Sequence, residues 1–294
     1  MDRISLRFEN LCLAVAPNAG GIVTAFWTEA RTGRIDWFKA ASGADALSAA
    51  CFPLVPYSNR IRNGRFRFAD REIALPLNFA DHPHSIHGHG WQARWQIADQ
   101  GADRLDLVYR HDADAWPFEY EARQTFHLSA GALEIEISVR NLSIEKMPAG
   151  LGLHPYFSLR ANALLNAQVD AVWLTDDEVM PTGRVRPPAR WDLATGVEVR
   201  DMAIDNGFDG WNGRASIAWP DDGVSLEIVA DAALRKLVVY APPGGEYFCV
   251  EPVSHMTDAF NRAADGALDT GMRVLPPGES LSARVSFKPS FQPA

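Results

Sequence analysis

The chain has 294 residues, of which 47% are hydrophobic and 22% charged, with a formal net charge of −9. This balance is typical of a soluble globular protein and excludes disordered and collagen-like classes. The negative charge is spread along the chain without runs, which argues against a nucleic-acid partner or an anionic membrane surface.

No stretch is long and apolar enough to span a bilayer. Residues 1–5 do not show the charged segment followed by an apolar segment that is typical of a secretory signal peptide. We therefore expect a cytoplasmic protein. The three cysteines, Cys12, Cys51 and Cys249, are far apart and each lies beside apolar residues. This spacing predicts reduced, buried packing residues rather than a disulfide framework or a thiolate metal cluster.

Alternation of apolar and polar residues recurs along the chain and predicts β-strands. It begins with Leu11, Leu13 and Val15, ahead of a turn signal at residues 17–21. It is strict in Leu133–Val139 and in Leu281–Phe287, where one face is apolar and the other polar, as in half-buried antiparallel strands. Looser versions of the pattern occupy Arg104–Arg110, Tyr120–Leu128, Ser225–Ala230 and Leu237–Ala241.

Helical periodicity is scarce. Only Ala41–Ala50 and Asp258–Ala264 could hold a turn or two of helix, and the proline-rich Arg184–Arg190 predicts an ordered irregular loop. No low-complexity linker divides the chain. We therefore predict one all-β domain over residues 1–294, built as a large sheet sandwich or barrel with few short helices.

The first polar cluster contains Asn59 and Arg60, within the arginine-rich stretch of residues 56–66. One interpretation is a polar connection with solvated charges. The other is a rigid set of donors for a hydroxyl-rich ligand, because a guanidinium offers a fixed fork and an amide offers a donor and an acceptor. Spacing alone does not separate these interpretations.

The second cluster has four histidines in eight residues, namely His82, His84, His87 and His89. Such density raises the possibility of a metal site. A cupin-type site would need a carboxylate a few residues after the His-x-His pair, and none follows His89 in Gly90–Trp95. The alternative is that one imidazole binds a neutral ligand while the glycines allow close approach.

Two isolated titratable residues lie in apolar surroundings, each followed by a proline. His154 precedes Pro155, and Glu251 precedes Pro252 far downstream. Because proline prevents a helix from continuing, we expect His154 at a strand end or in a loop. Alone, such a histidine would be a buried structural residue or a poised acid. The matching carboxylate favours an acid–base pair.

Residues 205–213 contain Asn-Gly and Asp-Gly pairs and predict a loop, in which Asp205 could present a carboxylate to sugar hydroxyls. Four tryptophans lie near the polar clusters. Most should belong to the core, but one or two could form an apolar wall for the C–H face of a sugar ring. They are Trp91, Trp95, Trp173 and Trp211.

Together these motifs resemble the aldose 1-epimerase (galactose mutarotase) family. The resemblance rests on six elements in the same order: Asn59-Arg60, His87-Gly88, the His154–Phe157 stretch, Asp205, Glu251-Pro252 and the closing Leu275–Glu279. It implies a large antiparallel β-sandwich, called a supersandwich, and interconversion of the α and β anomers of a free sugar. It also implies His154 as acid and Glu251 as base, with sugar contacts from Asn59, Arg60, His87, Tyr156 and Asp205.

The chain departs from the commonest family pattern in two places. The usual His-Gly-Gly reads His87-Gly88-His89-Gly90, and Ser158 replaces the Asn that usually follows Tyr-Phe. The first departure leaves open whether His87 or His89 contacts the sugar; we assign His87 because it leads the motif. The family includes members for different aldoses and for phosphorylated hexoses, so the particular sugar is left open.

Opening a hemiacetal ring requires one proton to leave the anomeric hydroxyl and another to reach the ring oxygen. An acid and a base suffice, so we expect no metal or other cofactor, a small-molecule sugar as partner, and a monomer or homodimer. We expect a nearby carboxylate to keep His154 charged near neutral pH. Two rival hypotheses are a non-catalytic carbohydrate-binding module and a metal-dependent cupin-like sugar isomerase centred on residues 82–89.

Overall fold

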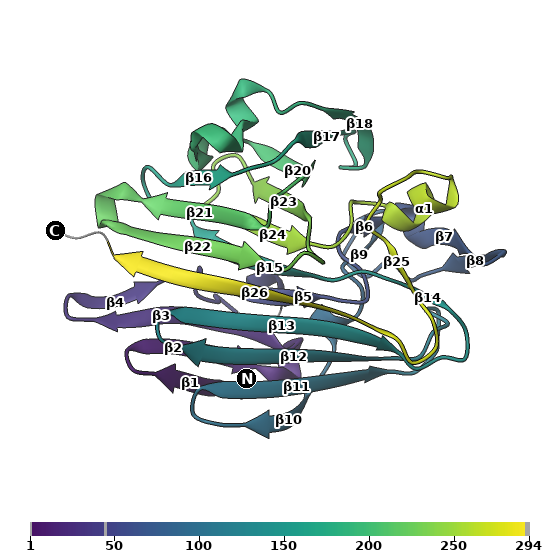
Figure 1. Cartoon of the computed structure of the whole chain (residues 1–294), viewed down its shortest axis with the longest axis horizontal. Helices are drawn as coiled ribbons and strands as arrows, with labels where there is room; N and C mark the ends of the chain where they lie inside the picture. Colours follow the sequence, from purple (N-terminus) through teal and green to yellow (C-terminus); the bar gives the residue numbers. More distant parts are fainter. Residues whose placement is uncertain (1, 44–45, 292–294) are drawn as a thin grey trace.

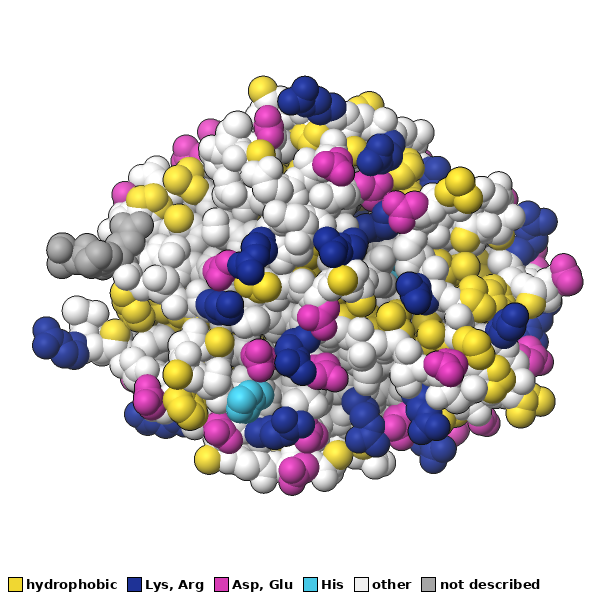
Figure 2. Space-filling view, viewed as in Figure 1, with side chains coloured by type: hydrophobic (Ala, Val, Ile, Leu, Met, Phe, Trp, Pro, Cys, Tyr) yellow, Lys and Arg dark blue, Asp and Glu magenta, His cyan; other side chains and the backbone are white. Residues whose placement is uncertain are grey.

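The computed structural model describes residues 2–43 and 46–291, which form two large antiparallel sheets stacked as a sandwich (Figure 1). No helix among these residues is long and apolar enough to cross a membrane. On the face drawn in Figure 2, acidic and basic side chains are interspersed. Both sheets draw strands from the two halves of the chain, so neither half forms a separate layer.

The first large sheet has nine strands. Its buried residues alternate with half-buried ones: Leu133, Ile135, Ile137 and Val139 point into the sandwich and their neighbours point outward. In order across the sheet the strands are β10 (Gln96–Gln100), β11 (Arg104–His111), β12 (Tyr120–Ser129), β13 (Ala132–Asn141), β26 (Ser280–Phe291), β22 (Val224–Ala230), β21 (Arg214–Trp219), β16 (Leu164–Ala167) and β19 (Val197–Glu198).

The second large sheet has eleven strands, and its central strands are buried on both faces. Across the sheet they run β1 (Ile4–Phe8), β2 (Leu11–Ala16), β3 (Ile22–Ala30), β5 (Cys51–Leu54), β15 (Gly152–Ser158), β24 (Tyr247–Val253), β23 (Lys236–Ala241), β20 (Ile204–Asp209), β17 (Ala171–Thr175) and β18 (Pro181–Val185), with β4 (Gly33–Asp36) beside β3.

Three two-stranded ribbons and short helices complete the described chain. The ribbons pair β6 (Arg60–Ile61) with β9 (Ser85–Ile86), β7 (Arg65–Phe68) with β8 (Arg71–Ala74), and β14 (Met147–Ala149) with β25 (Arg273–Leu275). Helix α1 spans Ala259–Ala264. Single 3-10 turns occur at Pro17–Ala19, Ala46–Ser48, Arg62–Gly64, Gly90–Gln92, Ala189–Trp191, Leu193–Thr195, Val199–Asp201 and Pro220–Asp222.

Aromatic side chains join the two sheets in the core. The ring of Phe38 contacts Phe26 and Phe157 of the eleven-stranded sheet and Phe287 of the nine-stranded sheet, the last at 4.8 Å between centroids and 85° between planes. Such edge-to-face pairs add about 0.5–1.5 kcal/mol each beyond the burial of their area. These rings belong to the buried cluster that joins the two sheets.

The fold class and the strand predictions are confirmed: each predicted strand coincides with an observed one, and Asp258–Ala264 contains α1. All three cysteines are buried and free. In Ala41–Ala50 the described residues form a 3-10 turn at Ala46–Ser48, and residues 44–45 lie outside the described chain. The loop predicted for Arg184–Arg190 is partly wrong, because β18 runs to Val185 and a 3-10 turn begins at Ala189.

Candidate active site

His154 and Glu251 lie opposite each other on neighbouring strands. In the β15–β24 pairing Gly152 is opposite Val253 and Tyr156 is opposite Cys249, a register that places His154 across from Glu251. The Nε2 atom of His154 is 3.3 Å from Oε1 of Glu251. Both side chains are buried, with 8% and 2% of their surface exposed. Residues almost one hundred positions apart therefore form a close pair.

The prediction that His154 lies at a strand end or in a loop is wrong, because it occupies the interior of β15. Pro155 excludes a helix but accepts an extended backbone, and it removes only one N–H donor. The ladder between β15 and β24 is interrupted between Gly152 and Tyr156, so the missing donor is tolerated there. A proline after a titratable residue is thus compatible with a strand interior.

Aromatic rings hold the imidazole of His154 in place. It stacks against Phe52 of β5 at 4.4 Å and against Tyr156 at 4.8 Å, with interplanar angles of 28° and 17°. Its Nδ1 atom and the Oε2 atom of Glu251 are buried without a hydrogen-bond partner. Because buried polar atoms are nearly always paired, two unpartnered atoms at one place indicate a ligand site.

Burial sets the protonation of the pair. It lowers the pKa of His154 to about 3, and it raises the pKa of Glu251 well above its usual value, with the negative charge of Asp205 adding to the effect. The expectation that a carboxylate keeps His154 charged is therefore wrong, since desolvation disfavours the charged imidazole and the positive charge of Arg60 adds to the effect. Burial therefore shifts both groups toward their uncharged forms, which are a neutral imidazole and a protonated carboxyl group.

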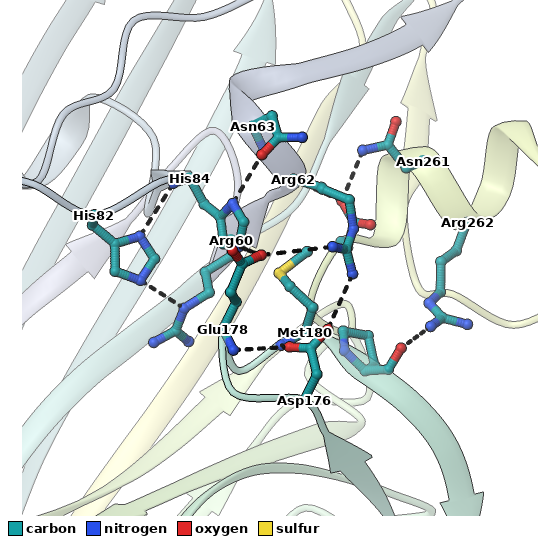
Figure 3. Close-up of polar contacts among 12 residues, drawn as sticks. Arg60, Arg62, Asn63, His82, His84, Asp176, Glu178, Met180, Asn261 and Arg262 are labelled. Atoms are coloured by element: carbon teal, nitrogen blue, oxygen red, sulfur yellow. Dashed lines mark hydrogen bonds and ion pairs between the residues drawn. The ribbon is translucent and has the colours of Figure 1, made fainter.

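Arg60 is fixed by three neighbours. Its Nε donates to Nε2 of His82 at 3.3 Å, Nη1 donates to Oδ1 of Asn59 at 3.1 Å, and Nη2 donates to Oδ2 of Asp205 at 3.3 Å. The contact with His82 is visible in Figure 3. With only 11% of its side chain exposed, the guanidinium is a pre-oriented charge rather than a mobile surface group.

The segment beside Arg60 is tied to the β17–β18 connection (Figure 3). Arg62 lies 3.6 Å from Asp176 and 3.8 Å from Glu178, and Nε2 of His84 lies 3.4 Å from Glu178. These contacts tie the connection to Arg62 and His84, and β17 itself pairs with β20, the strand that carries Asp205. Asp205 is the second residue of β20, so the loop predicted for residues 205–213 is wrong over its first five residues.

Asn59 and His87 hold each other in an unusual backbone conformation. Both have positive φ, 56° and 61°. The N–H of Asn59 donates to Nδ1 of His87 at 3.0 Å, and the N–H of His87 donates to the carbonyl of Asn59 at 3.0 Å. Burial lowers the pKa of His87 well below its usual value. A neutral imidazole that accepts at Nδ1 carries its hydrogen on Nε2, so His87 offers a donor.

All seven residues expected at the site line one cavity of about 270 Å³. They are Asn59, Arg60, His87, His154, Tyr156, Asp205 and Glu251. Trp91 lines the cavity as one of the expected tryptophans, whereas Trp95 and Trp211 are buried in the main core and Trp173 bonds Asp209. The sequence interpretation missed four aromatic residues of the lining. Phe52, Tyr240 and Tyr247 lie in strands, and Phe79 lies in the loop between β8 and β9, so no local motif marks them.

The four clustered histidines do not converge on one point. His87 lines the cavity, while His82 contacts Arg60 and His84 accepts from the N–H of Asn63 at 3.1 Å. His89 lies away from the cavity lining and stacks on His111 at 4.4 Å, with 2° between the ring planes. His89 does share a possible ligand group with His111 and Asp114, with ligand atoms within 4.8 Å of one another, but among the described residues no such group combines two of the four clustered histidines.

Known proteins resemble this chain in sequence and in fold. Residues 2–288 match the family model described as aldose 1-epimerase. The Escherichia coli protein YphB, which is uncharacterised, is 33% identical over 281 residues, covering 92% of each chain. Human galactose mutarotase is 27% identical over 169 residues, covering 52% of this chain and 48% of that one.

A solved structure of a putative aldose 1-epimerase from Escherichia coli superposes with a TM-score of 0.90 at 29% identity, covering 99% of both chains. A galactose mutarotase-like protein from Clostridium acetobutylicum gives a TM-score of 0.86 at 20% identity, covering 99% of this chain and 95% of that one. The fold is thus that of the galactose mutarotase-like proteins. The chain belongs to the aldose 1-epimerase family.

Proposed function

We propose that this protein interconverts the α and β anomers of a free aldose. The observation that carries the proposal is the 3.3 Å contact between His154 and Glu251 at the wall of a cavity that also presents Arg60, His87 and Asp205. Anomerisation moves protons at two oxygen atoms bonded to one carbon, and two groups this close can serve both oxygens.

The reaction needs one protonated and one unprotonated group, and our mechanism starts with one transferable proton on Glu251. In our mechanism the bound sugar draws this proton from Glu251 to His154. Glu251 then accepts the proton of the anomeric hydroxyl while His154 protonates the ring oxygen, so the C1–ring-oxygen bond breaks and an aldehyde forms. Rotation about C1–C2 and the reverse transfers close the ring on the other face. Protons balance, and both groups return to their starting state.

The remaining cavity residues have binding roles. Arg60 and the Nε2–H of His87 donate to sugar oxygens, and Asp205 accepts from hydroxyl groups. Phe52, Trp91 and Tyr156 offer apolar surface to the C–H face of the ring. The partner in this proposal is a small-molecule sugar substrate. Polarimetry of a panel of aldoses, pentoses and hexose 6-phosphates would identify it.

Glu251→Gln and His154→Asn test the proposal. Each should fold and lose about 10²–10⁴-fold in the polarimetric mutarotation rate, because each removes one positioned proton transfer. Glu136→Gln and His127→Asn are matched controls, since both residues are partly exposed on the nine-stranded sheet. If either site variant keeps the wild-type rate with every responsive sugar, the role of that residue is wrong.

A further inference from the structure

A third potential ligand lies beside the acid–base pair. Cys249 and Glu251 are two residues apart on β24, so their side chains point to the same face of the sheet. One ligand atom from each of His154, Cys249 and Glu251 lies within 4.8 Å of those of the other two. All three residues are buried, and Nδ1 of His154 and Oε2 of Glu251 have no hydrogen-bond partner.

These donors match the preferences of a soft divalent cation. Zinc binds imidazole nitrogen, thiolate sulfur and carboxylate oxygen in tetrahedral sites. Two bonds of about 2.0–2.1 Å at the tetrahedral angle put the nitrogen and oxygen about 3.3–3.4 Å apart. The observed separation between His154 Nε2 and Glu251 Oε1 is 3.3 Å, so two ligands already have the spacing of one tetrahedral edge.

Charge also favours such an ion. Burying a thiolate and a carboxylate side by side costs free energy because their negative charges are unpaired, whereas a divalent cation neutralises both charges. Two positive groups act on the ligands, Arg60 on Glu251 and Lys39 on Cys249, and the ion pair of Arg60 with Asp205 offsets part of the repulsion. His154 and Glu251 line the cavity, so an ion that enters through the cavity meets these two ligands before Cys249. Its fourth coordination position would then face the cavity.

We propose that His154, Cys249 and Glu251 form a binding site for a soft divalent cation of the Zn²⁺ type, occupied in competition with the ligand of the cavity. Binding releases two protons to solvent, one from the Cys249 thiol and one from the Glu251 carboxyl group, and forms three metal–ligand bonds with no change of oxidation state. A bound ion occupies the lone pairs of both members of the acid–base pair. Cation binding itself does not depend on the proposed mutarotation.

Direct binding is tested with Co²⁺ and Zn²⁺ on the full chain. The wild type should take up one equivalent of Co²⁺ with a near-ultraviolet thiolate-to-cobalt charge-transfer band, and calorimetry should show Zn²⁺ binding. In Cys249→Ser the band should disappear and the Zn²⁺ dissociation constant should rise roughly tenfold or more, because a hydroxyl replaces the soft ligand. Mg²⁺ should not compete, since it prefers oxygen ligands in octahedral geometry.

Cys51→Ser is the matched control. Cys51 is equally buried, but it precedes Phe52 on β5 and therefore points to the opposite face, into the core between the sheets. This variant should bind both ions like the wild type. A wild type without a thiolate–cobalt band, or a Cys249→Ser variant with unchanged Zn²⁺ affinity, would overturn the proposal.

The kinetic consequence separates this inference from the proposed function. Zn²⁺ should inhibit wild-type mutarotation reversibly, with EDTA restoring the rate, and more sugar should raise the concentration required. Cys249→Ser should be inhibited roughly tenfold less readily. Should the protein bind Zn²⁺ and yet catalyse no mutarotation, the cation site stands and the proposed function fails. If the enzyme catalyses mutarotation but shows no thiolate–cobalt band, the proposed function stands and the cation site fails.

Discussion

The two large sheets use their outer faces differently. The nine-stranded sheet exposes that face, so buried and half-buried residues alternate along β12 and β13. The eleven-stranded sheet covers its outer face around β15 and β24, where every residue is buried except Ser158 and Tyr247, which are half-buried. The outer face of the nine-stranded sheet is therefore in contact with solvent, whereas the outer face of the eleven-stranded sheet forms the base of the cavity.

Charged residues on the two outer faces differ in the same way. Lys236 and Asp209, 2.7 Å apart on the eleven-stranded sheet, are 7% and 8% exposed. Arg284 and Glu136, 3.0 Å apart on the nine-stranded sheet, are 52% and 42% exposed. Burial strengthens the dependence of each charge on its partner, because water no longer replaces a lost contact. Ion pairs with similar distances should therefore differ widely in energetic importance.

Removing one acid from each pair tests this difference and should produce the largest stability effect. Asp209→Asn leaves Lys236 buried without a full counter-charge and should lower the free energy of unfolding by about 3–5 kcal/mol. Glu136→Gln should change it by at most about 1 kcal/mol, as expected for an exposed pair. Urea unfolding monitored by circular dichroism measures both. Equal losses in the two variants would refute the contrast between the faces.

The same contrast explains how much of the fold the sequence predicted. Leu133–Val139 and Leu281–Phe287 were identified because their outer residues meet water and are polar. Asp205 was placed in a loop because Asn206-Gly207 and Asp209-Gly210 are turn-forming pairs. In the structure β20 pairs with β17 on one side and β23 on the other, and this tertiary pairing overrides the local preference.

For the candidate site, the sequence predicted the polar residues but neither the aromatic lining nor the protonation of the acid–base pair. Family resemblance located seven cavity residues, since each carries a side chain with recognisable chemistry. It did not indicate Phe52, whose apolar ring looks like any core residue until β5 places it against His154. Nor did it indicate the protonation of the acid–base pair. The pKa values of His154 and Glu251 follow from burial, which depends on packing that no local motif encodes.

Buried imidazoles should lower the free energy of unfolding in mild acid. We expect this to be the second largest of the three effects on the two sheets and the cavity. His255 follows β24 and accepts at Nε2 from the N–H of Ser58, and burial lowers its pKa to about 4. A histidine in the unfolded chain has a pKa of about 6.5. Between these values the unfolded state binds more protons, so this residue contributes full stability above pH 6.5 and loses about 3 kcal/mol as the pH falls through 4.

The measurement is the free energy of unfolding from pH 7 to pH 4 in the wild type and in His255→Gln. The variant should be less stable at pH 7, because it loses packing, yet its stability should decline less steeply toward pH 4. His127→Gln provides the comparison on the nine-stranded sheet, where the imidazole is 39% exposed. A pH slope that His255→Gln leaves unchanged would assign the acid sensitivity to other groups.

The ion pair at the cavity lies between the two extremes of burial and should show the smallest of the three effects. Arg60 is 11% exposed and Asp205 is 28% exposed. If Arg60 donates to a sugar oxygen, Arg60→Ala removes a charge-assisted hydrogen bond of about 1.5–3 kcal/mol, which should raise KM roughly 10- to 100-fold and change kcat less. Arg62→Ala is the matched control, because Arg62 is 43% exposed and contacts Asp176 and Glu178 instead. A KM effect of the same size in both variants, or a loss of folding in Arg60→Ala, would mean that Arg60 supports the loop rather than the sugar.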